Sequence, residues 1–122
     1  MTGNAYSDHV KLTSTMSPMQ KNRALNDGFR KTAKGGVVTI SMGIHLLGRA
    51  EVEIIMKRLS GPDGDNSCAA DSDHECGEIT VSNRLIYWEI NCYDNDLNDL
   101  SPDPTNPEQT KRFMTLMLDS EV

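Results

Sequence analysis

The chain has 122 residues, which fits one domain of common size, and its 18 acidic residues outnumber 12 basic ones, giving a formal net charge of −6. No run approaches the roughly 20 apolar residues that a membrane-spanning helix needs, and the N-terminus lacks the apolar stretch of a signal peptide. We therefore expect a cytoplasmic protein. The three cysteines cannot all pair within one chain, and nothing else suggests a secreted disulfide scaffold, so we expect free thiols.

The charges are segregated along the chain. Residues 1–59 carry nine basic and four acidic side chains, whereas residues 60–108 carry twelve acidic side chains and a single basic one, Arg84. Such an asymmetry suggests an electrostatic partner.

A helix is predicted to follow a flexible lead-in over residues 1–16, so that residues 17–122 form a single domain. Ser17 can cap the free backbone N–H groups, Pro18 suits the first helical position, and Gln20 can complete a capping box. Gly35-Gly36 ends this helix. Its predicted apolar stripe contains Met19, Leu25, Phe29 and Ala33. Its basic residues are Lys21, Arg23, Arg30, Lys31 and Lys34.

The central part of the chain alternates strand and helix patterns. Residues 37–42 are β-branched and bounded by glycines, which predicts a strand. Residues 49–59 predict a helix, because their apolar residues recur at spacings of three and four. Residues 63–75 have neither period and predict an exposed acidic loop.

A hairpin is predicted next, with strands at 78–81 and 85–93 joined by a tight turn. In the second strand Ile86, Trp88 and Ile90 share one face, and Tyr87 and Glu89 share the other. The start Asn106-Pro107-Glu108-Gln109 repeats the cap pattern and predicts a last helix. The apolar stripe of that helix contains Phe113, Met114, Met117 and Leu118.

Together these elements predict an α+β fold in the order α-β-α-β-β-α. The expected core is a small, mostly antiparallel three-stranded sheet packed by about three helices.

The motifs of catalysis and metal binding are incomplete. Asp63, Asp65 and Asp71 fit an EF-hand register, but Cys68 and His74 stand where that loop needs Gly and Glu. Cys68, His74 and Cys76 could bind zinc, yet no Cys-x-x-Cys pair accompanies them. No phosphate loop or nucleophile elbow occurs, so we expect neither an enzyme nor a cofactor.

Several segments resemble an uncharacterised proteobacterial family of short proteins, known only as a domain of unknown function and frequently carried on plasmids and other mobile elements. The resemblance spans about residues 24–121. It is carried by 24–27 (Ala-Leu-Asn-Asp), 35–38 (Gly-Gly-Val-Val), 74–77 (His-Glu-Cys-Gly), 88–94 (Trp-Glu-Ile-Asn-Cys-Tyr-Asp), 101–104 (Ser-Pro-Asp-Pro) and 115–118 (Thr-Leu-Met-Leu). It implies a mobile-element accessory protein and offers no catalytic residues.

Charge and this implied setting favour a non-enzymatic inhibitor of a host defence complex, either an anti-CRISPR or an antirestriction protein. Its acidic surface would compete for a basic groove that normally holds nucleic acid. The expected contacts are Asp63, Asp65, Asp71, Asp73, Glu75, Asp94, Asp96 and Asp99. Trp88 and Tyr93 are expected in the core.

Two alternatives remain open. A nucleic-acid-binding regulator would contact phosphates through the basic residues of the first predicted helix. A small metal-binding or hydrolytic protein would use His74 with Cys76.

Overall fold

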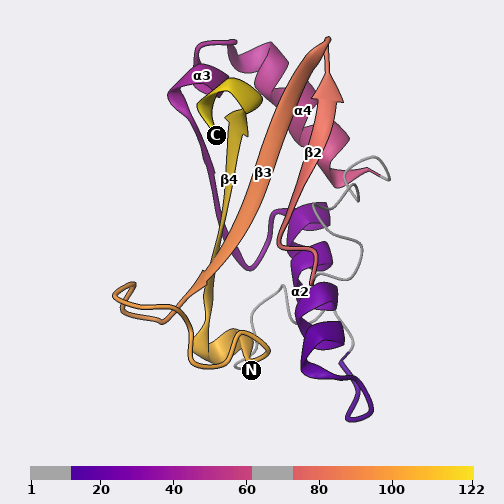
Figure 1. Ribbon diagram of the computed structural model, residues 1–122, viewed down its shortest axis with the longest axis vertical. Helices are drawn as coiled ribbons and strands as arrows, with labels where there is room; N and C mark the ends of the chain where they lie inside the picture. Colours follow the sequence, from indigo (N-terminus) through magenta and orange to yellow (C-terminus); the bar gives the residue numbers. More distant parts are fainter. Residues whose placement is uncertain (1–11, 62–72) are drawn as a thin grey trace.

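The computed structural model describes residues 12–61 and 73–122, which form an α+β fold (Figure 1). The helices are α2 (Pro18–Thr32), α3 (Met42–His45) and α4 (Arg49–Ser60). The strands are β1 (Gly36–Ile40), β2 (Cys76–Val81), β3 (Arg84–Tyr93) and β4 (Lys111–Leu118). Two 3-10 turns, η2 (Pro107–Gln109) and η3 (Asp119–Glu121), flank β4.

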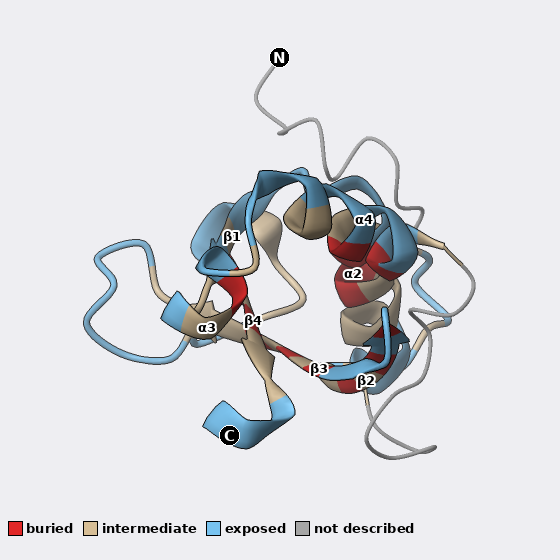
Figure 2. Ribbon diagram, turned by 90° about the horizontal axis from the view of Figure 1, so that it is seen from above, coloured by how far each residue is buried: buried red, intermediate tan, exposed pale blue. Residues whose placement is uncertain are grey.

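The strands form one four-stranded mixed sheet in the order β1-β4-β3-β2. The two inner strands and the hairpin are antiparallel, whereas β1 runs parallel to β4. Helices α2 and α4 lie against one face of this sheet, as the view from above shows (Figure 2). The molecule therefore has a helix-covered face, which we call the core face, and an opposite face, which we call the open face.

The hydrophobic core lies between the core face and the two longer helices. Leu25 and Phe29 of α2 and Ile55 and Leu59 of α4 are almost fully buried there. From the sheet come Ile79, Val81, Ile86, Trp88, Ile90, Met114 and Leu116, also buried. The prediction that Trp88 is a core residue is confirmed, whereas Tyr93, also expected in the core, is only half-buried and lies on the open face.

Helix α2 begins as predicted. Ser17 accepts a hydrogen bond from the backbone N–H of Gln20 at 3.1 Å, and the Gln20 side chain accepts one from the Ser17 N–H at 2.8 Å. This capping box satisfies two N–H groups that the first helical turn leaves free. The helix ends at Ala33, which takes the left-handed conformation, just before the glycines. Met19 and Ala33 are exposed, so the predicted stripe is correct only for Leu25 and Phe29.

The hairpin is confirmed, and its turn is tight because Ser82 and Asn83 both have positive φ angles, 52° and 63°. Two such residues give a turn whose twist matches that of the flanking strands. Ile86, Trp88 and Ile90 lie on the core face, and Tyr87 and Glu89 lie on the open face, as predicted.

The last predicted helix is wrong, because residues 111–118 form strand β4. The cap residue Asn106 starts only the short turn η2. Beyond it, burial alternates with a period of two: Arg112, Met114 and Leu116 are buried and their neighbours are not. Pairing with β1 on one side and β3 on the other satisfies the backbone of β4, which overrides the local helix signal.

Three further expectations need correction. The sheet has four strands and not three, because β4 replaces a helix and recruits β1 as its parallel neighbour. A short additional helix, α3, starts at the cap residue Ser41 and shortens the predicted first strand. Cys76 is disulfide-bonded, whereas Cys92 is a free thiol, so the expectation of free thiols fails at Cys76.

Two buried arginines hold the helices to the rest of the fold. Arg30 of α2 is 2% exposed and donates hydrogen bonds to the backbone oxygens of Leu59 and Gly61 at the end of α4. Arg112 of β4, also 2% exposed, donates to Asn26 of α2 at 3.0 Å and to the Pro104 backbone oxygen at 2.9 Å. Burying a guanidinium is costly unless it is hydrogen-bonded, so these contacts are needed for its burial.

Candidate protein-binding surface

The acidic residues predicted to bind a partner lie in separate places. Asp63, Asp65 and Asp71 fall outside the described residues. Asp73 and Glu75 lie just before β2, whereas Asp94, Asp96 and Asp99 belong to the turn that follows β3. That turn projects at the lower left of Figure 1, well away from the start of β2. The structure therefore does not bring the two described groups together.

Asp73 and Glu75 border a cavity of about 260 Å³ at the end of β3. The Ile90 N–H donates to the Glu75 backbone oxygen at 2.6 Å, and the Ser101 N–H donates to the Cys92 backbone oxygen at 3.0 Å. β2 begins only at Cys76, and beyond that point residue 101 lies beside β3 in place of β2. The edge of β3 between these two hydrogen bonds therefore faces the cavity.

One acidic side chain of the turn after β3, that of Asp94, stabilises the turn itself. The Asp94 carboxylate accepts a hydrogen bond from the Asn98 N–H at 3.0 Å, and the Asp94 N–H donates to the Asp99 backbone oxygen at 2.9 Å. Side chains that bond to nearby backbone in this way stabilise turns. Asp96 and Asp99 are exposed.

Two acidic residues that the sequence prediction left out, Glu78 and Glu89, lie on the open face beside Tyr87. Glu78 pairs directly with Tyr87 across β2 and β3, and Glu89 is the next residue of β3 on the same face. Across the other side of β3, Tyr87 pairs with Met117 and Glu89 pairs with Thr115. The alternation of β3 already placed Tyr87 and Glu89 together, so the signal for this cluster was present in the sequence.

The electrostatics of the open face show like charges held close together. The pKa of Glu75 is raised, first because burial desolvates its carboxylate and then because Asp73 and Glu89 are negative. The pKa of the Tyr87 phenol is also raised, by desolvation and then by Glu89, Glu75 and Glu78. Negative neighbours disfavour each ionised group, so this region has an unbalanced negative potential.

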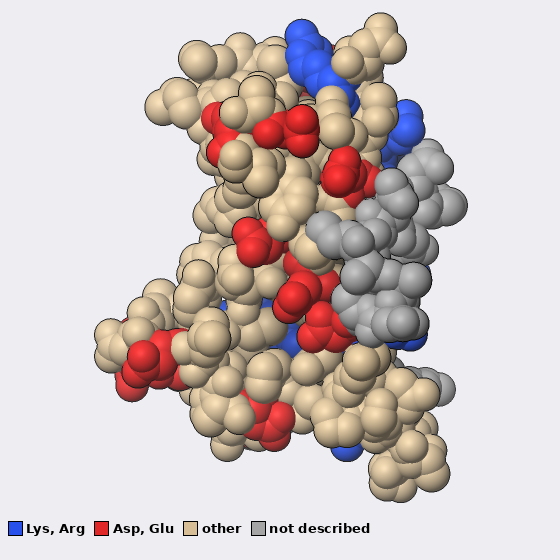
Figure 3. All heavy atoms as spheres, viewed as in Figure 1, with Lys and Arg blue, Asp and Glu red and all other residues tan. Residues whose placement is uncertain are grey.

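No ion pair among the described residues neutralises this cluster. Ion pairs in that part of the chain join Arg49 to Glu53, His74 to Asp27 and Arg84 to Glu51. Figure 3 views the side of the sheet that α2 and α4 leave uncovered; acidic side chains are spread over it, and Lys and Arg lie mostly at its margins. Within the described strands, Lys111 is the basic residue on this face, beside Tyr93.

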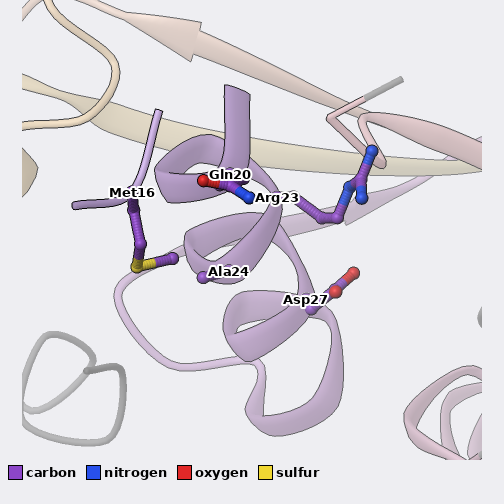
Figure 4. Close-up of a pocket in the computed structure, with 5 residues that line it drawn as sticks. All are labelled: Met16, Gln20, Arg23, Ala24 and Asp27. Carbon is purple, nitrogen blue, oxygen red and sulfur yellow. The ribbon is translucent and has the colours of Figure 1, made fainter. Parts of the chain in front are cut away.

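The basic residues of α2 do not form one surface. Arg30, which the nucleic-acid alternative needs as a phosphate contact, is buried against the end of α4. Lys31 and Lys34 are exposed near the end of the helix. A hollow of about 320 Å³ lies on α2 and the turn before it (Figure 4). Its lining residues are Met16, Gln20, Arg23, Ala24 and Asp27, which mix one cation with one carboxylate.

The metal alternative depends on His74 and Cys76. His74 Nδ1 lies 2.9 Å from a carboxylate oxygen of Asp27, and Cys76 is disulfide-bonded, so its sulfur is not a thiolate. Within residues 12–61 and 73–122, no three His, Cys, Asp or Glu side chains are grouped to hold a metal ion. Burial raises the pKa of the Cys92 thiol; Arg112 opposes that shift, and Asp73 and Glu75 add to it.

The fold is thus a small α+β domain with a one-sided mixed sheet and an acidic open face. The model of a family described as protein of unknown function (DUF3768) matches residues 41–121, and the chain belongs to this family. This match confirms the resemblance to an uncharacterised family. No curated protein and no solved structure matches the chain. None of the described helices has the length and apolar character needed to cross a membrane.

Proposed function

We propose that this protein is a non-enzymatic inhibitor that binds a host defence complex and occupies a basic, nucleic-acid-binding groove of that complex. The observation that carries the proposal is the negative charge on the open face, where Glu78 and Glu89 have no cationic partner among the described residues. A groove built to hold phosphates presents Lys and Arg side chains, and a folded surface of opposite charge can dock there.

The charge pattern of the whole chain supports the same proposal. The net charge is −6, and twelve of the 18 acidic residues fall within residues 60–108, the segment that supplies β2, β3 and the turn after β3. Long-range attraction from such a surface increases the rate of encounter with a basic partner and weakens as salt rises. The mobile-element setting, which we propose from the resemblance, supplies the reason for a defence target, either a CRISPR effector or a restriction enzyme.

The first experiment captures the target. Tagged protein is incubated with nuclease-treated lysate of a host that carries CRISPR and restriction systems, and retained proteins are identified by mass spectrometry. We expect one stoichiometric nucleic-acid-handling complex. A parallel capture from untreated lysate is the control: proteins retained there but lost from the nuclease-treated lysate would contradict the proposal and favour direct nucleic-acid binding through α2.

The second experiment tests competition. Captured complex is purified and mixed with labelled target DNA, with and without the inhibitor. We expect DNA binding at constant salt to fall as inhibitor approaches one equivalent, and the affinity of the inhibitor for the complex, measured separately, to weaken as salt rises. Unchanged DNA binding at saturating inhibitor would overturn groove competition.

A further inference from the structure

The open face of the sheet differs from an ordinary solvated sheet face in its aromatic content. Tyr93 and Phe113 lie there in an edge-to-face contact, with ring centroids 5.7 Å apart and an interplanar angle of 77°. Tyr87 and Met117 pair across β3 and β4, and both are only partly exposed. Tyr and Met are enriched in protein interfaces because they offer a large contact area.

The carboxylates of Glu78 and Glu89 on this face do not stabilise the fold through contacts with other described residues. Neither Glu78 nor Glu89 forms a side-chain hydrogen bond or ion pair in the part of the chain that the structure describes. By contrast, the Asp94 carboxylate accepts a hydrogen bond within its own turn, and the Asp103 carboxylate accepts hydrogen bonds from Thr105. The Glu78 and Glu89 carboxylates lie around a phenol and are available to contact an external cation.

Cross-strand register makes these groups one continuous patch. Side chains directly opposite each other have Cβ atoms about 4.5–5.5 Å apart, so Glu78, Tyr87 and Met117 form one row across three strands. Thr115 and Glu89 form the neighbouring row. We call these five residues the sheet-face patch.

We infer that the sheet-face patch is the docking surface of this protein and that its occupant is a protein surface presenting Lys or Arg side chains. This inference rests on the proposed function and sharpens it, since it replaces the acidic turns by the open face as the contact. The argument for the occupant is charge complementarity: two uncommitted carboxylates flank an aromatic ring, and a cation can contact both the carboxylates and the ring face.

A strand face also suits docking because it is rigid. Glu78 and Glu89 project from β2 and β3, whose backbones are paired with each other, whereas Asp96 and Asp99 belong to a turn. A backbone that is fixed before binding loses less conformational entropy on association. The patch therefore should contribute more affinity than the turn at equal charge.

The test compares two variants with the same change of net charge. Glu78→Lys/Glu89→Lys reverses the patch, and Asp96→Lys/Asp99→Lys reverses the turn; thermal unfolding confirms that both are folded. We expect the patch variant to bind the captured defence complex at least about tenfold more weakly and the turn variant within about threefold of wild type. Equal losses, or a larger loss in the turn variant, would overturn the inference while leaving the proposed function intact.

A second readout does not depend on the defence complex. Labelled protein is titrated with an octa-arginine peptide and followed by NMR. We expect the largest shift changes at the sheet-face patch, and changes confined to residues 94–99 would overturn the inference. If the peptide maps to the patch but no defence complex is captured, the docking surface stands and the proposed function fails.

Discussion

The two faces of β3 differ in what their side chains do, although the residues alternate along one strand. Ile86, Trp88 and Ile90 are buried against the helices, and their contribution is to stability. Tyr87 and Glu89 remain partly exposed among like charges, which contribute no stability. A single strand thus carries core residues on one face and part of the proposed docking surface on the other, so substitutions of adjacent residues should affect different properties.

The largest expected effect comes from the core side of β3. Trp88→Ala removes the largest fully buried side chain and leaves a cavity, which should lower the free energy of unfolding by about 3–5 kcal/mol. Urea unfolding measures this loss. Tyr87→Ala, one residue away on the open face, is the matched control and should cost clearly less. Similar losses for both variants would contradict the separation of the two faces.

The same comparison holds in β4, where Lys111 and Arg112 are neighbours on opposite faces. Arg112→Met leaves the Asn26 side-chain oxygen and the Pro104 backbone oxygen without their donor, at a cost of about 2–3 kcal/mol. Lys111→Met changes an exposed side chain and should alter stability by no more than about 0.5 kcal/mol. Thermal or urea unfolding of both variants measures these changes in stability. An Arg112→Met variant as stable as wild type would show that the hydrogen bonds of Arg112 contribute nothing to stability.

Close packing on the core side can be tested at a glycine. A Cβ at Gly36 would lie 2.4 Å from the Arg112 backbone oxygen and 2.7 Å from the Phe29 ring, so Gly36→Ala should destabilise the fold by about 1–3 kcal/mol. At Gly61 the nearest atom would be 3.5 Å away and φ is −88°, so Gly61→Ala should be neutral or slightly stabilising. If both variants unfold at the wild-type temperature, β1 has room that the structure does not show.

The smallest expected effect concerns charge on the open face. Glu89→Gln removes a negative neighbour, so the raised pKa values of Glu75 and Tyr87 should both fall toward their usual ranges. NMR titration of the labelled Glu carboxyl and Tyr ring carbons measures these shifts. Unchanged titration of both groups would mean that the cluster is more screened than its geometry implies.

Two carboxylates, Glu75 and Glu121, should make the stability of the fold depend on pH with opposite signs. Folding raises the pKa of Glu75. Its contribution to the free energy of unfolding is therefore fully present below the pKa that Glu75 has in the unfolded chain, and is lost as pH rises through its pKa in the folded protein. Glu121 accepts hydrogen bonds from the Ser41 hydroxyl and from the N–H groups of Leu118 and Gly43, which lower its pKa. Its contribution is present above the unfolded pKa and is lost as pH falls.

Much of the fold could be predicted where local signals and tertiary packing agree. The capping box at Ser17, the apolar spacing of Ile55 and Leu59, and the hairpin around Ser82 and Asn83 all involve contacts within a few residues. Residues 111–118 could not be predicted in this way, since their strand forms only with partners 18 or more residues distant. Arg30 was misplaced for a similar reason, because its partners lie at the end of another helix.

By itself, the sequence determined the segregation of charge, the start of α2, the helix α4 and the alternation of β3, because these depend on composition and on periods within one element. Only the tertiary structure decided that β4 lies between β1 and β3, that Arg112 is buried, and that Glu78 and Met117 lie beside Tyr87 and Glu89 on the open face. These outcomes depend on which segments pair in space, and pairing is set by the joint burial and hydrogen bonding of distant residues.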